Sequence, residues 1–410
     1  MAAVVALAVG CAARGGRVQP PVDMTAVPAS RPADCYGGAI EARPPLDPLG
    51  RRLKAELDRW ASGKGLAALT EDERLDRVAS DMACAMSGGK SPAPELLTFL
   101  ASYYGLVEPE PSVVLISGEA GAEAAIIDQL GRKLADAPAS ERSIQVGIGV
   151  CRAGEAFQAV IALQEHVLAL SPIPRTLPRG GRAGIAGRVA AGLHDPTVLL
   201  TGPAGAVSRL PTRVAGNAFW AELECSGDGA YQVEIMAEDR RGPSVVANFP
   251  VYCGRPPPRS LRLTTSPAPA SPASPAAIEQ QILVLLNRDR AVSGVPPLVS
   301  DVRLAEVARR YSQEMASRRE VAHLSQSSGS AVDRIRAAGI TPAPTVVAEN
   351  VGQDYSAEGS EQGFMTSPGH RANILSSAVT HVGIGVALGA HPDGDMTPIF
   401  VTQLFAGWSR

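Results

Sequence analysis

The sequence predicts an α+β domain at the carboxyl end of the chain, an all-β sandwich before it, and a second α+β domain nearer the amino end. Three observations lead to this prediction. A proline-rich run over residues 254–276 separates residues 277–410 from the rest of the chain. Residues 168–256 alternate between apolar and polar positions with period two. Residues 46–165 repeat part of the pattern that is found in residues 277–410.

Residues 1–11 are typical of an export signal. Residues 1–10 are almost wholly apolar, and Cys11 begins a polar stretch, as at the lipidation site that ends a lipoprotein signal peptide. An ordinary signal peptide is the alternative, and no basic residue precedes the apolar run. Residues 12–45 are proline-rich and lack periodicity, which indicates a tether. We therefore expect an exported protein, either secreted or held in the cell envelope by a lipid on Cys11, with no other membrane contact.

The internal repeat predicts that residues 46–165 form a degenerate copy of the last domain. A shift of 229 positions lays residues 57–86 on residues 286–315 without a gap, and the shared apolar positions recur at helical spacing. The run VGIGV at residues 146–150 then recurs at residues 382–386. No histidine follows Met86 in the way that His323 follows Met315. We expect this copy to keep the scaffold and to lack the site described below.

The alternating segment predicts a β-sandwich over residues 168–256, followed by a linker over residues 257–276. Cys225 and Cys253 both fall on the apolar face of their predicted strands, so we expect a disulfide bond between them across the core. Cys35, Cys84 and Cys151 are left, and none of them belongs to a CxxC pair. Cys84 can bridge to Cys151, with Cys35 as a competitor for either.

The last domain combines helices with an antiparallel sheet. Apolar residues recur at helical spacing in residues 278–286 and 304–315, whereas residues 382–388 and 398–406 alternate as strands. Asp393-Gly394 marks a hairpin between the strands. Helices that cover such a sheet predict an α/β/α sandwich.

Short sequence motifs in residues 276–410 resemble those of the bacterial SCP-like proteins of the CAP superfamily. This superfamily includes the cysteine-rich secretory, antigen 5 and pathogenesis-related proteins. The motifs occur in the order and spacing of that family: LLNRDRAVSGVPPL, AHLS, AENVG, FMTSPGHRANIL, HVGIGVAL and IFVTQLFAG. The combination of AEN with SPGHRANIL is the most specific part. The match covers nearly all of the last domain.

The resemblance implies a cleft lined by two histidines and acidic residues, which hold a divalent cation in some members. Carried over by motif, the histidines are His323 and His370, and the first acid is Glu349, which is also the one candidate for a catalytic role if the cleft is an active site. The second acid falls at Ser367, so this chain lacks the full set. Two imidazoles and one carboxylate still suffice for Zn²⁺ with an open water position, whereas Ca²⁺ or Mg²⁺ would bind more weakly.

Other residues of the same motifs are expected to support the cleft. Asn350 would hold the loop that presents Glu349, Asn373 would cap the turn after His370, Gln403 would hydrogen-bond near His370, and Ser325 would reach the cleft from its position two residues after His323.

These observations leave three functions open and exclude others. A net charge of −3 gives no electrostatic support for nucleic-acid binding. The leading expectation is a binding module of the cell envelope for an envelope or extracellular ligand, with Zn²⁺ or another divalent cation as its cofactor. The alternatives are a metal-dependent hydrolase of peptides or cell-wall material, in which Glu349 serves as base, and a structural lipoprotein with a vestigial cleft.

Overall fold

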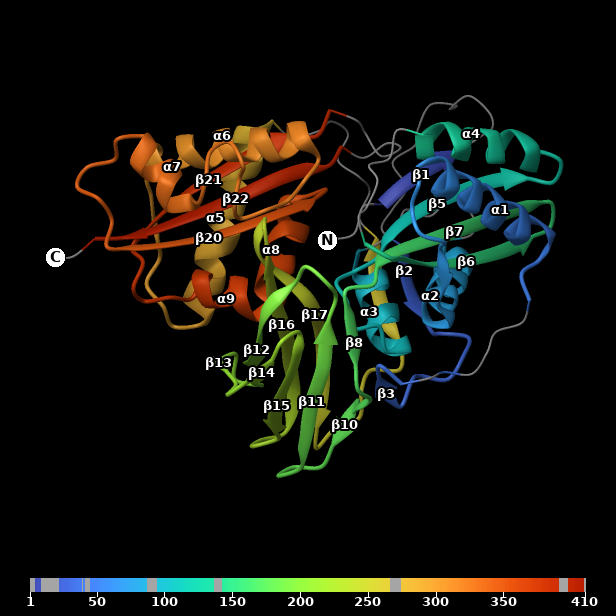
Figure 1. The fold of residues 1–410 in the computed structure, drawn as a ribbon, viewed down its shortest axis with the longest axis horizontal. Coiled ribbons are helices and arrows are strands. Elements are labelled where there is room, and N and C mark those ends of the chain that lie inside the picture. The colour runs from blue at the N-terminus through green and yellow to red at the C-terminus, as the bar shows by residue number, and fades with distance from the viewer. Residues whose placement is uncertain are drawn as a thin grey trace.

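The structure, a computed structural model, places two α+β domains on either side of an all-β domain (Figure 1). It describes residues 4–8, 22–38, 40, 45–86, 94–135, 142–265, 274–390 and 397–408. The mixed α+β architecture predicted from the sequence is confirmed. Among the described helices, none combines the length and the apolar composition that a membrane crossing requires.

The C-terminal domain is a four-stranded sheet between two helical layers, with strand order β19-β21-β22-β20. Its elements are α5 (Pro275–Val292), β19 (Val299–Ser300), α6 (Val302–Arg318), α7 (Ala331–Ala337), β20 (Val346–Asp354), α8 (Ala357–Thr366), α9 (Pro368–Ile374), β21 (His381–Leu388) and β22 (Ile399–Gly407). Helices α5 and α8 pack with Val382, Ile384 and Val386 on one face of β21. Helices α6 and α7 pack on the opposite face. Because helices cover both faces of the sheet, the domain is an α/β/α sandwich.

The N-terminal α+β domain has a five-stranded sheet of order β1-β5-β7-β6-β4. Its elements are β1 (Val4–Ala8), α1 (Pro48–Gly63), β4 (Thr70–Glu71), α2 (Glu73–Ala85), α3 (Pro94–Tyr104), β5 (Ser112–Glu119), α4 (Glu123–Ala135), β6 (Ile144–Ala153) and β7 (Ala156–Glu165). The order β4-β6-β7-β5, with β4 parallel to β6 and the other pairs antiparallel, is also the order and direction of β19-β21-β22-β20.

In each α+β domain, glycines of one strand allow a helix to pack closely against it. The pairs are α2 on β6 in the N-terminal domain and α6 on β21 in the C-terminal domain. A Cβ added at Gly147 would lie 2.1 Å from a backbone atom of Leu75, and one added at Gly383 would lie 2.1 Å from the same atom of Leu304. Leu75 and Leu304 are separated by the 229 positions of the sequence repeat. The two domains therefore share strand order and helix seating, while their common origin stays a prediction.

Between them, the all-β domain packs two sheets face to face around one apolar core. One sheet has the order β10-β17-β16-β12-β13 and the other has the order β14-β15-β11-β8. Its strands are β8 (Leu168–Leu170), β9 (Ile173–Pro174), β10 (Thr176–Leu177), β11 (Arg182–Val189), β12 (His194–Thr201), β13 (Val207–Arg209), β14 (Arg213–Ala215), β15 (Ala218–Glu224), β16 (Gly229–Asp239) and β17 (Gly242–Cys253).

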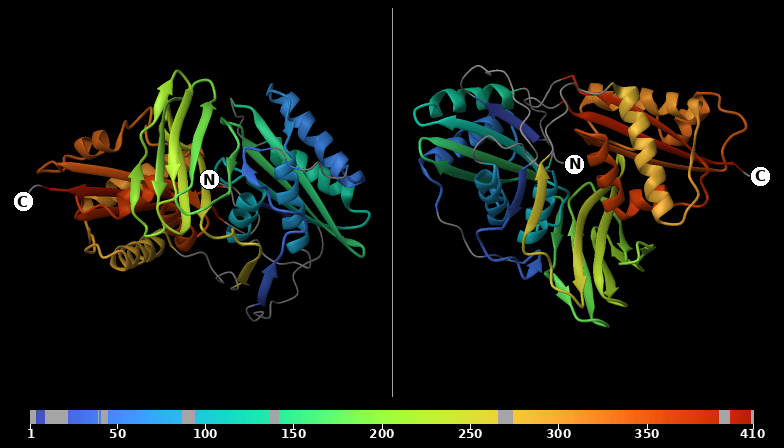
Figure 2. Two further views of the ribbon diagram at one scale, coloured as in Figure 1. Left: turned by 90° about the horizontal axis from the view of Figure 1, so that it is seen from below. Right: turned by 180° about the vertical axis from the view of Figure 1, so that it is seen from behind.

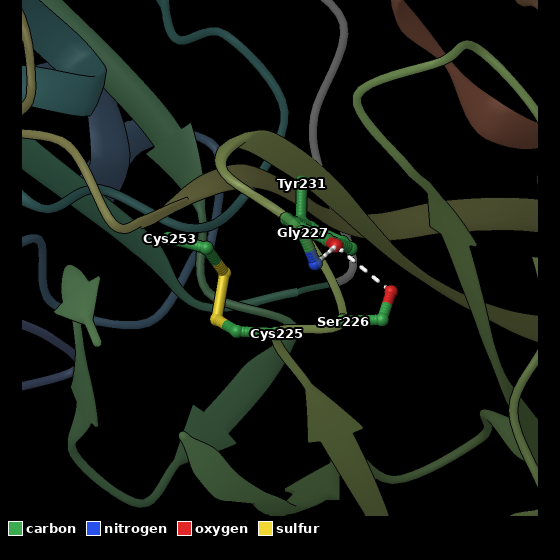
Figure 3. Close-up of a disulfide and its surroundings, with 5 residues drawn as sticks. All are labelled: Cys225, Ser226, Gly227, Tyr231 and Cys253. Atoms are coloured by element: carbon green, nitrogen blue, oxygen red, sulfur yellow. Dashed lines mark hydrogen bonds between the residues drawn. A yellow bond between two sulfur atoms is a disulfide. The ribbon is translucent and has the colours of Figure 1, made fainter. Parts of the chain in front are cut away.

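Two disulfide bonds occur in the described residues. Cys225 follows β15 in one sheet and pairs with Cys253 at the end of β17 in the other, as predicted (Figure 3). Both cysteines are fully buried, which agrees with their place on the apolar face of each strand. Cys84 pairs with Cys151 within the N-terminal domain, and Cys35 keeps a free thiol. The open choice among these three cysteines is thereby resolved.

Parts of the predicted tether and linker form strands. Strand β2 (Val22–Ala26), drawn in blue, pairs with β18 (Leu261–Thr265), drawn in yellow (Figure 2). Strand β3 (Cys35–Tyr36) pairs with β9. Each partner lies far away in the sequence, so local periodicity could not reveal the pairing. Within the predicted export segment, β1 lies parallel to β5. The role of that segment in export stays a prediction, and Cys11 lies outside the described residues.

Candidate functional site

A cavity of about 410 Å³ opens between the C-terminal domain and the sandwich. From the C-terminal domain come the ends of β20, α7 and α9 and the loop after α6. From the sandwich come β16 and β17. Its walls are Met236, Pro243, Val245, His323, Ser330, Ala331, Val332, Val347, Ala348, Glu349, Ser367, Gly369, His370 and Asn373. The three residues predicted as the centre of the site, His323, Glu349 and His370, therefore meet at one cavity.

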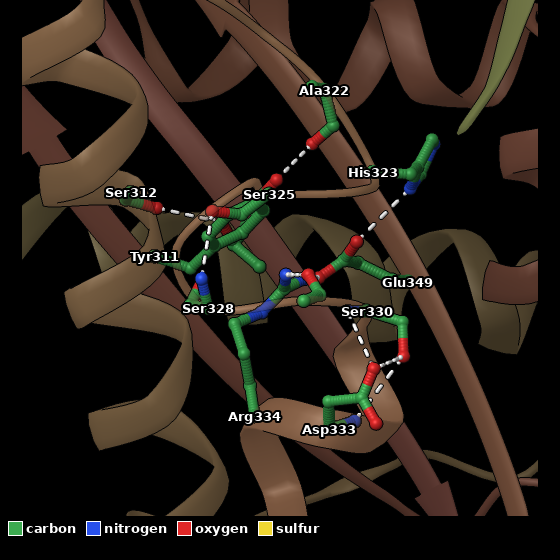
Figure 4. Close-up of polar contacts among 12 residues, drawn as sticks. Tyr311, Ser312, Ala322, His323, Ser325, Ser328, Ser330, Asp333, Arg334 and Glu349 are labelled. Carbon is green, nitrogen blue, oxygen red and sulfur yellow. Dashed lines mark hydrogen bonds and ion pairs between the residues drawn. The ribbon is translucent and has the colours of Figure 1, made fainter. Parts of the chain in front are cut away.

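His323 and Glu349 form a hydrogen-bonded pair (Figure 4). Glu349 lies on β20, and its Oε1 is 3.0 Å from Nδ1 of His323. Because a carboxylate only accepts hydrogen bonds, Nδ1 carries a proton, and in the neutral form of an imidazole Nε2 is then an acceptor. The structure describes no protein partner for Nε2, which leaves this nitrogen available to a ligand in the cavity.

Arg334 holds the other oxygen of Glu349. The Arg334 guanidinium forms an ion pair with Oε2 of Glu349, and both side chains are almost completely buried. The guanidinium also lies over the ring of Tyr311, with its central carbon 3.4 Å from the ring centroid. It reaches this place because Ser330 and Asp333 form a capping box that starts α7 (Figure 4). Glu349 is thus a neutralised, fixed carboxylate.

His370 lies in the first turn of α9. Ser367 caps this helix by accepting a hydrogen bond from the His370 N–H, and Pro368 follows at the first helical position. Burial, together with the neighbouring His323, lowers the pKa of His370 to about 3. The imidazole is therefore neutral at any physiological pH. In the described structure its ring nitrogens have no hydrogen-bond partner, and its ring centroid is 6.4 Å from that of His323.

A chain of buried amides fixes this arrangement from behind. Asn350 donates to the carbonyl of His370 at 3.2 Å and to Oε1 of Gln403 at 2.9 Å. Asn373 donates to Oδ1 of Asn350 and to the carbonyl of Glu349. Gln403 in turn donates to Oε2 of Glu361 at 2.7 Å. The supporting roles expected for Asn350 and Gln403 agree with these contacts. The expectation for Asn373 is corrected, because its side chain bonds to Asn350 and to the Glu349 carbonyl on β20 instead of to the turn after His370.

Ser325 does not reach the cavity. Its hydroxyl donates to Glu314 and accepts from the backbone N–H groups of Ser327 and Ser328. The expectation that it joins the cleft is corrected, because the chain turns after His323 and points this hydroxyl toward α6. Ser325 closes the turn that follows the histidine.

Sequence reasoning missed several residues of the site. The Ser330 and Asp333 capping pattern could have predicted the start of a short helix. No pattern in the neighbouring sequence indicates that Arg334 contacts Glu349. Met236, Pro243 and Val245 come from another domain. Glu361 is almost fully buried, and burial raises its pKa to about 8 even though Gln403 donates to it. Its position on the inner face of α8 carried no motif.

The divalent cation that the resemblance implies would need ligands from His323, Glu349 and His370. Among the described residues, no group of three or more His, Cys, Asp or Glu side chains is arranged to hold a metal ion. Glu349 is engaged by Arg334 and His323, so it cannot turn to a cation without breaking one of these contacts. The two imidazoles remain, and this donor set fits Zn²⁺ better than Ca²⁺ or Mg²⁺. Metal binding stays a prediction.

The chain is similar to known proteins over part of its length. The sequence model of the cysteine-rich secretory protein family, CAP, matches residues 283–405. The uncharacterized protein YkwD of Bacillus subtilis is 33% identical over 122 residues, which are 30% of this chain and 47% of that protein. The uncharacterized membrane protein YlbC of the same bacterium is 34% identical over 109 residues, 26% of this chain and 31% of YlbC. The chain thus spans less than half the length of either relative.

Two solved structures give weaker matches. An extracellular protein containing a SCP domain from Bacillus anthracis is 18% identical, with a TM-score of 0.29, over 55% of this chain and 82% of that one. An outer surface protein from Borrelia burgdorferi is 17% identical, with a TM-score of 0.29, over 33% of this chain and 97% of that one. The matched segment 283–405 runs from within α5 to β22 and contains His323, Glu349 and His370. Residues 283–405 of this chain are a CAP domain of the cysteine-rich secretory protein family.

Proposed function

We propose that this chain is an exported protein of a bacterial cell envelope and that its CAP domain binds a small ligand in the cavity between β20, α9 and the sandwich. The cavity volume of about 410 Å³ suits a small molecule or a short segment of a polymer. The printed names of similar structures, an extracellular protein and an outer surface protein, support export.

One observation carries this proposal: among the described residues, Nε2 of His323 and both ring nitrogens of His370 have no hydrogen-bond partner, and they lie beside a carboxylate whose charge Arg334 already balances. His323 and His370 are free to bind, while Glu349 serves to orient His323. Because Nε2 of His323 accepts, a ligand with a hydroxyl or N–H group would satisfy it. If Zn²⁺ binds, His323 and His370 would hold it, and it would supply a Lewis acid for the ligand.

Zinc titration of the full chain tests the metal component. Calorimetry would compare the wild type with His370→Ala and with the control His194→Ala, whose histidine lies exposed on the sandwich. We expect zinc affinity to fall at least tenfold in His370→Ala and to stay unchanged in the control. Equal affinity in all three proteins would contradict a metal role for the imidazole pair. Binding of organic ligands would then be the remaining function of the cleft, and its absence as well would favour a structural lipoprotein.

A hydrolase is the second candidate, and the pairing of His323 with Glu349 favours it. An imidazole that is oriented by a carboxylate through Nδ1 presents Nε2 as a general base. The contacts give this role to His323 and an orienting role to Glu349, instead of the base role expected from the sequence. Cleavage of peptides and peptidoglycan by the wild type but not by His323→Gln would support this function. A wild type without any cleavage would rule it out for these substrates.

Membrane attachment has its own test. If Cys11 carries a lipid, Cys11→Ser should release the protein from membranes into the soluble fraction. Retention of this variant at the membrane would contradict lipidation and leave secretion with an ordinary signal peptide as the alternative.

A further inference from the structure

The sandwich forms one wall of the CAP cavity. Met236 on β16 and Val245 on β17 are directly opposed in the strand ladder, and both line the cavity together with Pro243. All three side chains are apolar. They line the same cavity as His323 and His370, where Nε2 of His323 and the ring nitrogens of His370 have no hydrogen-bond partner among the described residues.

The turn between β16 and β17 also holds the loop that carries His323. The carbonyl of Arg241 accepts hydrogen bonds from the backbone N–H groups of His323 at 3.1 Å and of Leu324 at 2.9 Å. The Arg241 side chain pairs with Glu320, just before the same loop. Gly242 has a positive φ of 90°, and a Cβ there would lie 3.3 Å from the Cβ of His323. This close approach needs a glycine.

A buried carboxylate of the sandwich holds the helix that carries His370. Glu234 on β16 is 0% exposed. Its Oε1 accepts a hydrogen bond from the Gly369 N–H at 2.8 Å, and its Oε2 accepts one from the Ser367 hydroxyl. Nearby, Arg371 donates to the carbonyl of Gly205 at 3.1 Å. The start of α9 is therefore fixed by the sandwich from two sides.

We propose that the cleft is a binding site shared by two domains, in which β16 and β17 supply the wall for the apolar part of a small ligand and hold both histidines in place. This inference rests on the proposed binding function. The ligand class that it implies is a small molecule with an apolar body, which packs on Met236 and Val245, and a polar end with a hydroxyl or N–H group, which meets the imidazoles.

The apolar wall can be tested with N-phenyl-1-naphthylamine, a neutral dye with an apolar body and one N–H group, whose fluorescence rises in apolar surroundings. The full chain would be titrated as wild type, as Val245→Lys, and as the control Val214→Lys, which changes an exposed valine on β14 of the other sheet. We expect at least tenfold weaker binding by Val245→Lys, because the bound dye would cover the charged ammonium group of the new lysine. The control should bind the dye like the wild type. Met236→Gln replaces Val245→Lys if circular dichroism shows that the lysine variant is unfolded.

The positioning role of Glu234 has a separate readout. Amide hydrogen exchange over residues 367–373 would be measured in the wild type, Glu234→Ala and Glu234→Gln. We expect Gly369 to exchange at least tenfold faster in Glu234→Ala, because its acceptor is lost. Glu234→Gln keeps a carbonyl oxygen at this place and should stay close to the wild type.

The outcomes separate this inference from the proposed function. If the wild type binds the dye and the cavity variant binds it equally well, the CAP domain binds ligand but the sandwich wall is overturned. If Glu234→Ala leaves exchange at Gly369 unchanged, the positioning role is overturned. If the wild type does not bind the dye, the ligand class is wrong, while zinc titration still tests the imidazole pair.

Discussion

Glu361→Gln should stabilise the C-terminal domain, and its effect should grow with pH. Glu361 is almost completely buried on α8; Gln403 donates to its Oε2, and its Oε1 has no hydrogen-bond partner among the described residues. Burial raises the pKa of this carboxyl from 4.5 to about 8. Glutamine has nearly the same shape and keeps the oxygen that accepts from Gln403. It cannot ionise.

The magnitude follows from the difference between the folded and unfolded pKa values. The folded state holds a proton that the unfolded state releases above pH 4.5, so stability is highest below pH 4.5 and falls as pH rises toward 8. Each pKa unit corresponds to about 1.4 kcal/mol, so keeping Glu361 protonated in the folded state costs about 3 kcal/mol at pH 7 and somewhat more at pH 8. We expect Glu361→Gln to recover this free energy at pH 7–8 and to change little at pH 4.

Urea unfolding, followed by the fluorescence of Trp408, would measure the effect. Trp408 lies at the end of the CAP domain, and Trp60→Phe with Trp220→Phe would make it the only tryptophan of the chain. Each free energy of unfolding would be compared between variant and parent at the same pH, so that other titrating groups cancel. Glu358→Gln, an exposed carboxylate on the same helix, is the matched control.

The result that would refute the reasoning is a stability difference that does not depend on pH. A Glu361→Gln variant that is less stable than its parent at pH 8 would refute it as well, because the glutamate would then be stable in its ionised form. The control Glu358→Gln should change stability by less than about 0.5 kcal/mol at every pH, as is usual at exposed positions.

Three further predictions concern packing, charge and cross-linking. Gly383→Ala should unfold the CAP domain at a lower temperature by calorimetry, since its Cβ would meet the backbone of α6; a melting temperature equal to that of the wild type would show that α6 can shift at no cost. Arg334→Met should cost about 3–5 kcal/mol in urea unfolding, because the charge of Glu349 loses its buried partner, and adding Glu349→Gln should recover part of this loss. If Glu349→Gln recovers none of the loss, the stacking of Arg334 on Tyr311 matters more than its charge. Replacing both Cys225 and Cys253 by Ala should lower the stability of the sandwich by about 3–4 kcal/mol, and an unchanged thermal transition would contradict this expectation.

The fold of the CAP domain could be predicted from the sequence because its signals are local. Asp301 caps α6 through hydrogen bonds to the next turn, and apolar residues along that helix recur at helical spacing. In the VGIGV strand, valine and isoleucine face α5 while the glycines admit α6. Cys225 and Cys253 could be paired because both lie on the apolar face of a strand. Patterns of this kind depend only on neighbours in the chain.

The candidate site could be predicted only in part. His323, Glu349 and His370 were found through their motifs, and the supporting amides came with them. Arg334 could not be found, because no local pattern tells where a long side chain ends. The strand pairing of β2 with β18 was missed for a related reason, since each short strand gains its order from a partner far away in the sequence.

The sequence by itself determined the CAP domain, its neighbouring sandwich and the two histidines of the cleft, since helix periodicity, strand alternation and short motifs are properties of contiguous residues. Only the tertiary structure decided what surrounds those histidines. It places a carboxylate of the sandwich, Glu234, against Ser367, where the sequence leaves an acidic position unfilled, and it neutralises Glu349 with Arg334. These contacts join residues 133 and 15 positions apart. They exist because buried charges and polar groups must find partners, and folding brings the partners from wherever the chain can supply them.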